Sequence, residues 1–341
     1  METAAKHIKE LLENHQGANV IITTHHKPDA DAIGSSLGLY LFLSKMNLNV
    51  KVITPTDFAG FLHWMVGAND IIIFEGNEQK CEEITNNADF IFCLDFNHLS
   101  RINEYGVIVA EANAKKILID HHQYPQGFED YTYWDDKASS TCELVYRWIN
   151  DIEQENQLDK DIASCLYTGI MTDTGSFRFS NCSADTHQIV ANLMNYGIDH
   201  VWIHDKIYDS FTEDRVKFIG YAISQKLEVL PEYRTAIITI NSDELKKYKI
   251  QTGDTEGLVN YGLSIEGVKF AILVIDRTKL VKMSFRSKGS FPANQFAMNH
   301  FNGGGHFNAA GGSSTLTFEE TISEIKNNLK QYQKQLLDDE K

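Results

Sequence analysis

Three apolar runs of this sequence are followed at once by acidic and histidine side chains. The chain continues from Ala18–Thr24 into His25, from Phe90–Leu94 into Asp95, and from Ile117–Ile119 into a consecutive Asp-His-His. The side chains gathered at these three places are His25, Asp29, Asp31, Asp95, Asp120, His121 and His122. Carboxylates packed closely together raise one another's pKa unless a cation neutralises them. We therefore expect this group to bind metal ions.

The donor atoms indicate which metal chemistry to expect. Imidazole nitrogen and carboxylate oxygen, without a cysteine thiolate, suit Mn²⁺, Mg²⁺, Fe²⁺ or Zn²⁺ better than a soft metal. The donors outnumber the needs of one ion, so two ions are expected. Two ions about 3.5–4 Å apart can share an oxygen nucleophile and hold a phosphate between them. Taken alone, Asp95 has the simpler explanation of a helix N-cap or turn residue, but recurrence at three strand ends favours metal ligands.

Whether these acidic and histidine side chains meet in space depends on the strands and helices that carry them. In the first half, short apolar runs alternate with segments long enough for helices, as in βαβ units whose parallel sheet is covered on both faces. Ligands of such sheets bind outside the carboxyl ends of the strands. The expected strands are 18–24, 50–54, 71–74, 90–94 and 117–119, and a helix is expected over 32–46.

The second half has a different pattern, mainly helical from 139 to about 227 and strand-rich afterwards. The expected helices are 139–150, 158–171, 185–196, 212–228 and 317–336, and the expected strands are 235–240, 268–275 and 280–286. We predict an α/β protein with a catalytic parallel-sheet domain over 1–200, a helical connector over 201–228 and a smaller α/β domain over 229–341. The active site is expected in the cleft between the domains.

The overall charge limits the partners of this chain. Its 341 residues suffice for about two domains, and a hydrophobic content of 43% excludes an intrinsically disordered chain. The 47 acidic residues against 31 basic ones leave a formal net charge of −16. Affinity for long nucleic acid depends on neutralising many phosphates with Lys and Arg. Long duplexes are therefore excluded as partners, and a phosphate-ester substrate must be short.

The sequence also favours a cytoplasmic setting. Its five cysteines are odd in number, form no C-x-x-C pair and are expected to be reduced. The N-terminus has no apolar signal-peptide core, and no stretch approaches the roughly 18 consecutive apolar residues of a membrane span. We expect no membrane partner. A homodimer is compatible with the sequence, although no residue indicates one.

Four segments resemble, in this order, the motifs of the DHH phosphoesterases: TTHHKPDADAIGSSLGL, LDFN, IDHH and TDTGSFRFS. The C-terminal half is similar to the DHH-associated domain through the segments 284–287 (SFRS) and 303–312 (GGGHFNAAGG). The resemblance covers nearly the whole chain, with weak stretches at 55–90 and 240–265. Among subfamilies, the chain looks most like the group of nanoRNases and 3′-phosphoadenosine 5′-phosphate (pAp) phosphatases.

The resemblance implies ligands for two ions. The first ion would be held by His25 and Asp29, the second by Asp31, His121 and Asp173, and Asp95 would bridge both. Asp173 follows a helix-like run, so only the resemblance identifies it.

Three further residues of the predicted centre have other roles. Asp120 would orient His121 or its neighbours. His122 would face the substrate phosphate, either stabilising its charge or acting as general acid. His26 lies outside the H-x-x-x-D-x-D spacing and is expected to point elsewhere.

Seven residues are expected to bind the substrate: Arg178, Arg286, Ser287, Gly303, Gly304, Gly305 and His306. Glycine lets the backbone approach an anion closely, and Arg286 can hold a phosphate with a bidentate fork. A glycine run alone is more often a flexible turn, and an internal ion pair is the alternative for Arg178.

The function implied by the resemblance is a Mn²⁺-dependent phosphoesterase, with Mg²⁺ or Fe²⁺ as alternative metals. It would hydrolyse short oligoribonucleotides (nanoRNA) and pAp with a hydroxide activated by two ions. One alternative is a phosphodiesterase for linear or cyclic dinucleotides, such as pApA or cyclic di-AMP. A pyrophosphatase or exopolyphosphatase would require more Lys and Arg near Arg286. A nucleotide-binding regulatory protein is the non-enzyme alternative, and the filled ligand positions argue against it.

Overall fold

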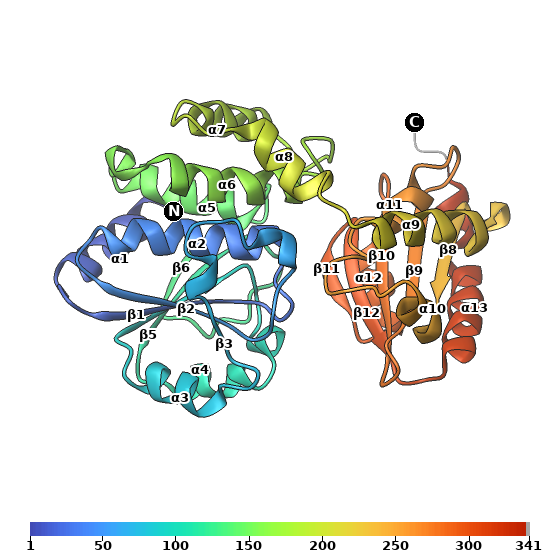
Figure 1. Cartoon of the computed structure of the whole chain (residues 1–341), viewed down its shortest axis with the longest axis horizontal. Coiled ribbons are helices and arrows are strands. Elements are labelled where there is room, and N and C mark those ends of the chain that lie inside the picture. Colours follow the sequence, from blue (N-terminus) through green and yellow to red (C-terminus); the bar gives the residue numbers. More distant parts are fainter. Residues whose placement is uncertain (339–341) are drawn as a thin grey trace. The chain divides into compact units, whose positions relative to one another are not determined.

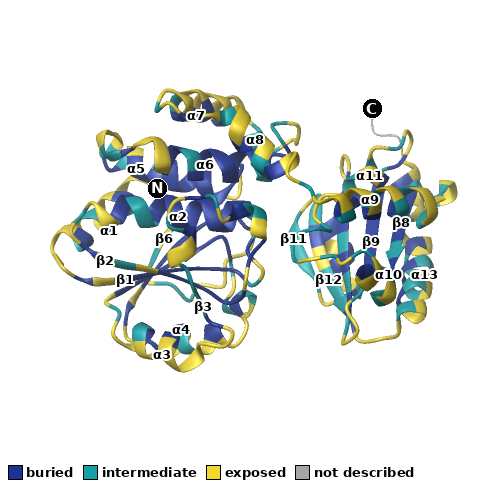
Figure 2. Ribbon diagram, viewed as in Figure 1, coloured by how far each residue is buried: buried dark blue, intermediate teal, exposed yellow. Residues whose placement is uncertain are grey.

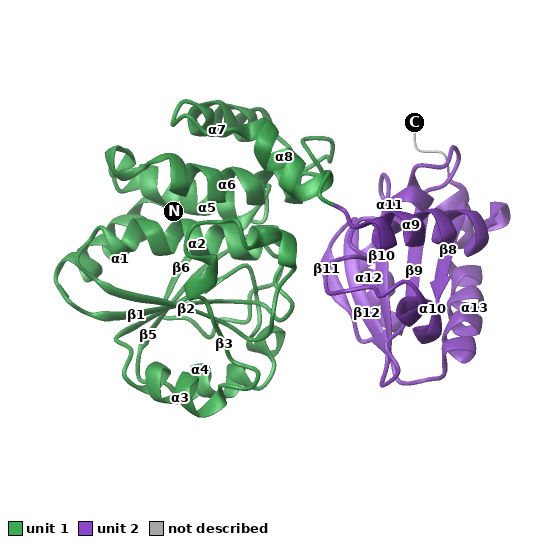
Figure 3. Ribbon diagram, in the orientation of Figure 1, with its two compact units in different colours: residues 1–210 green, residues 211–341 purple. Residues whose placement is uncertain are grey.

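The computed structural model describes residues 1–338 and divides into two compact units (Figure 3). Unit 1 covers Met1–Ser210, and unit 2 begins at Phe211. The segment 201–228, expected as a connector, is shared between them: α8 (His200–Tyr208) belongs to unit 1 and α9 (Glu213–Gln225) to unit 2. Within the described residues, no helix is both long and apolar enough to cross a membrane.

Unit 1 is built on a six-stranded sheet in which every neighbouring pair runs parallel. Its strands are β1 (Asn19–Thr24), β2 (Asn49–Thr54), β3 (Ile72–Ile73), β4 (Phe90–Leu94), β5 (Lys115–Asp120) and β6 (Tyr131–Trp134). Their order is β3-β2-β1-β4-β5-β6. The chain thus extends the sheet first to one side of β1 and then, from β4 on, to the other. The carboxyl ends of β1 and β4 are the topological switch point, where open α/β sheets bind ligands.

Helices cover both faces of this sheet (Figures 1 and 2). Val20 and Ile22 of β1 enter the larger core, whereas Ile21 between them enters a second core on the other face. The larger core lies under α1 (Glu2–Glu13), α2 (Ala30–Ser44), α5 (Thr141–Asp151), α6 (Lys160–Asp173) and α7 (Ala184–Met194). The second core lies under α3 (Glu78–Asn86) and α4 (Tyr105–Glu111). Burial on both faces explains why the strands read as continuous apolar runs.

Glycines allow α2 and α6 to pack closely. A Cβ on Gly34 of α2 would lie 2.6 Å from the carbonyl oxygen of Cys165 in α6. A Cβ on Gly169 of α6 would overlap the Sγ of Cys142 and lie 2.6 Å from Oδ1 of Asp31. This contact therefore places the start of α2 close to the last turns of α6.

Unit 2 has a six-stranded sheet of a different kind. Its strands are β7 (Leu227–Leu230), β8 (Thr235–Ile240), β9 (Phe270–Asp276), β10 (Val281–Ser287), β11 (Gly304–His306) and β12 (Ala309–Ser314), in the order β11-β12-β10-β9-β8-β7. β8 and β9 run parallel, and the other neighbouring pairs are antiparallel. The other helices of unit 2 are α10 (Ser242–Lys247), α11 (Leu258–Leu263), α12 (Ala293–His300) and α13 (Phe318–Leu337). One core packs against α12 and α13, and a second packs against α9 and α11.

The glycine-rich segment 303–312 is not a flexible turn, the alternative that a glycine run suggests. It forms the hairpin of β11 and β12, in which Gly304 pairs with Gly311. Glycine has low strand propensity, so the sequence of this hairpin carries little sign of it. The close packing of Gly303 explains part of the composition, because a Cβ there would overlap the carbonyl oxygen of Gly311.

Candidate metal centre

The first part of the centre lies at the switch point of the unit 1 sheet. His25 follows β1 directly and Asp95 follows β4, and these two strands are neighbours. Nε2 of His25 lies 3.4 Å from Oδ2 of Asp95 and 3.9 Å from Oδ1 of Asp29. Asp29 is also the N-cap of α2, since its Oδ1 accepts hydrogen bonds from the backbone of Asp31 and Ala32. The cap therefore holds the first carboxylate beside the imidazole.

The second part of the centre surrounds His121. Nε2 of this residue lies 3.5 Å from Oδ1 of Asp95, 3.5 Å from Oδ2 of Asp173 and 3.9 Å from Oδ2 of Asp31. Asp31 stands in the first turn of α2 and Asp173 is the last residue of α6, so the close packing of these helices brings the two together. Asp95 thus presents Oδ2 to His25 and Oδ1 to His121.

The backbone of Asp95 indicates that its position is imposed by the surrounding structure. Its φ is 63°, in the left-handed region that non-glycine residues rarely adopt. Such conformations persist only where the surroundings over-determine them, and they gather at functional sites. Asp95, which lies between the two imidazoles, is thus one of the non-glycine residues with a positive φ.

The donor set fits divalent ions. Nδ1 of His25 lies 3.0 Å from the carbonyl oxygen of His26, and Nδ1 of His121 lies 3.2 Å from that of Ala138. Because a carbonyl only accepts, both rings donate from Nδ1 and turn Nε2 towards the carboxylates. In that orientation Nε2 meets the carboxylates, and either a proton on Nε2 or a bound cation can lie between them. Atoms that each lie about 2.1 Å from one ion are roughly 3–3.5 Å apart, close to the spacings seen here.

Burial and charge shift the pKa values of the cluster. Burial raises the pKa of Asp31 well above its ordinary range, and the charges of Asp95 and Asp173 raise it further. Burial opposes ionisation of Asp95 too, but contacts with His121 and His25 hold its pKa well below the usual range. For both histidines burial lowers the pKa, and the neighbouring carboxylates outweigh it, so the pKa is raised. The cluster therefore retains protons that a bound cation would displace.

Asp120 and His122 form a separate buried pair. Oδ1 of Asp120 lies 2.8 Å from Nδ1 of His122, a contact that can orient the His122 ring. Oδ2 of Asp120 is buried and has no hydrogen-bond partner among the described residues. Asp120 and His122 also lie within ligand range of Asp95. The ring of His26, in contrast, contacts Asn103 through Nδ1 at 2.9 Å.

The predicted substrate residues of unit 2 share part of one sheet. Arg286 of β10 and His306 of β11 are both paired with Ala309 of the intervening β12, so their side chains project from the same face. Lys282 lies on this face too, because it is four residues from Arg286 on β10, and sequence reasoning missed it although the period-two pattern indicates it. Two strand spacings of about 4.8 Å separate Arg286 from His306.

Most of the other predicted substrate residues, but not Gly304, have contacts within the fold. Ser287 is buried, and its hydroxyl donates to the carbonyl of Phe291 at 2.6 Å and accepts from Asn308 at 2.8 Å. Gly305 has a φ of 140°, and a Cβ there would lie 2.5 Å from the carbonyl oxygen of Ala309, whereas Gly304 has open space around it. In unit 1, Arg178 is exposed and its Nε donates to the carbonyl of Gly175 at 2.7 Å.

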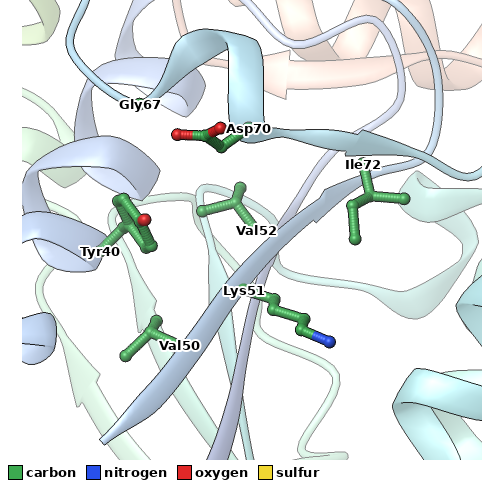
Figure 4. Close-up of a pocket in the computed structure, with 7 residues that line it drawn as sticks. All are labelled: Tyr40, Val50, Lys51, Val52, Gly67, Asp70 and Ile72. Atoms are coloured by element: carbon green, nitrogen blue, oxygen red, sulfur yellow. The ribbon is translucent and has the colours of Figure 1, made fainter. Parts of the chain in front are cut away.

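A pocket of about 240 Å³ lies elsewhere in unit 1 (Figure 4). It is lined by Tyr40 of α2, by 50–52 in the middle of β2, by Gly67 and Asp70, and by Ile72 of β3. Because it lies along β2 and not beyond its carboxyl end, it contains none of the predicted metal ligands.

Comparisons with known proteins agree with this architecture. Residues 19–170 match the DHH family, N-terminal domain, and residues 235–335 match the DHHA1 domain. The chain belongs to the DHH family of phosphoesterases. It is 30% identical over 317 residues to the probable bifunctional oligoribonuclease and PAP phosphatase of Streptococcus mutans, covering 91% of this chain and 95% of that protein.

Two further similarities extend over most of the chain. The bifunctional oligoribonuclease and PAP phosphatase of Thermus thermophilus is 29% identical over 305 residues, covering 89% of this chain and 86% of that protein. The crystal structure of an exopolyphosphatase-related protein from Bacteroides fragilis superposes with a TM-score of 0.93 at 39% identity, covering 99% of this chain and 98% of that one. The expected family and fold class are thus confirmed.

Proposed function

We propose that this protein is a Mn²⁺-dependent phosphoesterase that hydrolyses short oligoribonucleotides and pAp. The observation that carries the proposal is the placement of Asp95, whose two carboxylate oxygens face two different imidazoles at 3.4 and 3.5 Å. One carboxylate between two groups of ligands is suited to bridging two ions.

The residues divide into two ligand groups in this proposal. His25 and Asp29 would hold one ion, Asp31, His121 and Asp173 would hold the other, and Asp95 would contact both. When bound, two divalent ions lower the pKa of a water nucleophile and offset the negative charge of the phosphate.

His122 would serve the phosphate directly. The carboxylate of Asp120 accepts the hydrogen bond from Nδ1, which fixes the orientation of the ring. A ring held in this way can donate a proton to the leaving oxygen or a hydrogen bond to the phosphate. In this proposal Asp120 orients His122, and His122 either stabilises the charge of the phosphate or acts as general acid.

The choice of substrate rests on different observations. A net charge of −16 disfavours long polyanions, and relatives aligned over most of this chain are named oligoribonuclease and PAP phosphatase. Arg286 and His306 on one face of the unit 2 sheet would bind the remaining nucleotide.

A hydrolysis panel tests the proposal. The full chain, stripped of metal with a chelator and reloaded with Mn²⁺, is offered pAp, a labelled RNA dinucleotide, a long RNA, cyclic di-AMP and tripolyphosphate at equal concentration. We expect turnover of pAp and the dinucleotide well above the others, and none after chelation. Preference for cyclic di-AMP or tripolyphosphate would overturn the substrate assignment, and the absence of Mn²⁺-dependent turnover on every compound would overturn the proposed activity.

A further inference from the structure

The first turn of α5 contacts two of the predicted metal ligands. The backbone N–H groups of Thr141 and Cys142 donate to Oδ2 and Oδ1 of Asp31 at 2.7 and 2.9 Å. The hydroxyl of Thr141 donates to Oδ1 of Asp95 at 2.9 Å. Both carboxylates, and Thr141 itself, are buried. One turn of helix therefore holds a carboxylate of the second ligand group and the carboxylate shared by both groups.

Two properties of a helix start explain the contact with Asp31. The first N–H groups of a helix have no partner within it, and they carry a partial positive charge. The Ser140 side chain caps only the N–H of Glu143, so the amides of Thr141 and Cys142 remain available for a carboxylate. Backbone amides hold Asp31, so no side-chain substitution at Thr141 removes that contact.

A buried carboxylate fixes this turn in the fold. Oε2 of Glu143 accepts hydrogen bonds from the hydroxyls of Ser139 at 2.5 Å and of Thr186 at 2.9 Å, and Arg147 forms an ion pair with Oε1. Thr186 belongs to α7, and Ser139 lies two residues before the start of α5. The position of Thr141 is therefore set by contacts on both sides of the turn, independently of Asp95.

We infer that Thr141 is a positioning residue, whose hydroxyl fixes the rotation of the Asp95 carboxylate so that each oxygen faces a different ligand group. The inference rests on the proposed two-ion function. An ionised carboxylate only accepts, so Thr141 must be the donor, and Oδ1 retains a second lone pair for an ion. Without this hydrogen bond the carboxylate can turn and present both oxygens to one ion. Asp95 then no longer contacts both ligand groups, although the fold is retained.

The test compares Thr141→Val with Thr141→Ser and Thr168→Val. Valine keeps the shape of the side chain without the hydroxyl, and serine keeps the hydroxyl. Thr168 is also fully buried, but its hydroxyl donates only to the backbone of Ser164 within α6. Mn²⁺ binding to each full-length protein is measured by calorimetry, the electron paramagnetic resonance spectrum reports whether the ions are coupled, and thermal unfolding after chelation checks the fold.

Removing a group that supports a metal ligand costs about 10-fold to 100-fold in affinity. We expect Thr141→Val to lose about that much for the weaker ion, to lose the coupled signal, and to lower kcat with little change in KM. Thr141→Ser and Thr168→Val should stay within about threefold of the unmodified protein. Wild-type Mn²⁺ affinity and a coupled signal in Thr141→Val would overturn the inference.

Two further results separate the possible failures. If the unmodified protein bound no Mn²⁺, the proposed function would fail. If the unmodified protein bound two coupled Mn²⁺ ions and Thr141→Val did the same, the function would stand and the positioning role would fail. Should valine prevent folding, Thr141→Ala is read by the same criteria against Thr141→Ser.

Discussion

Unit 1 buries most of its predicted metal ligands near the ends of parallel strands, whereas unit 2 carries several predicted substrate residues half-buried on a largely antiparallel sheet. In unit 1, Asp95 and His121 are each 3% exposed and contact one another. In unit 2, Arg286 and His306 are separated by a whole strand. A parallel sheet gathers the ends of its strands at one edge, so residues distant in sequence are concentrated there. An antiparallel sheet spreads them along a face, which suits contact with an extended ligand.

The largest expected effect on activity is that of Asp95→Asn in unit 1. Asparagine keeps the shape but removes the charge, and since changes to supporting residues alone cost about 10-fold to 100-fold, we expect kcat to fall by more than about 100-fold. Asp161→Asn, an exposed acid in the first turn of α6, is the matched control and should leave kcat unchanged. Rates are measured on pAp with saturating Mn²⁺. Retention of most activity by Asp95→Asn would remove the shared-ligand role.

Substitution of a predicted substrate residue in unit 2 should raise KM and leave kcat unchanged. Arg286→Ala removes a charge-assisted hydrogen-bonding group, an effect of about 1.5–3 kcal/mol, or roughly 10-fold to 100-fold in KM. Lys330→Ala, an exposed cation on α13, should change neither constant. A large fall in kcat at unchanged KM for Arg286→Ala would contradict the division of roles between the units.

Mn²⁺ affinity should rise with pH. The pKa values of His25 and His121 are raised above their ordinary 6.5 in the metal-free protein, so protons compete with Mn²⁺ even somewhat above that pH. Each proton released contributes up to about tenfold per pH unit. Because the folded chain binds more protons than the unfolded one, the metal-free protein should also lose stability as pH rises above 6.5. Calorimetry and thermal unfolding between pH 6 and 8 check both effects, and affinity independent of pH would contradict them.

The smallest expected effects are on stability, and they distinguish a closely packed glycine from one with open space around it. Gly169→Ala places a Cβ against Cys142 and Asp31, and overpacking of this kind costs about 1–3 kcal/mol of unfolding free energy. Gly304→Ala meets no atom within 4 Å and should leave stability unchanged. Denaturant unfolding measures both. Equal stability of the two variants would show that the close contact of α2 and α6 is not required.

Much of unit 1 could be predicted from the sequence because both chemistry and topology follow from strand ends. Apolar runs identified β1, β4 and β5, and the parallel arrangement placed His25, Asp95 and His121 at one edge. Strand order was not available from the sequence, so the switch point between β1 and β4 emerged only in the structure.

Other parts of the centre could not be found by that reasoning. Asp173 ends a helix, and its place depends on the close helix contact that Gly34 and Gly169 permit. Thr141 was passed over because a helix start gives no indication of which carboxylate it will contact. In unit 2, β11 and β12 were not among the expected strands because glycine masks strand periodicity.

The most direct test of the account is to locate Mn²⁺ by anomalous diffraction in crystals of the loaded protein. We predict two peaks in unit 1, one bonded to His25 and Asp29, the other to Asp31, His121 and Asp173, and both to Asp95. A single peak, or peaks away from Asp95, would contradict a two-ion centre built on a shared carboxylate.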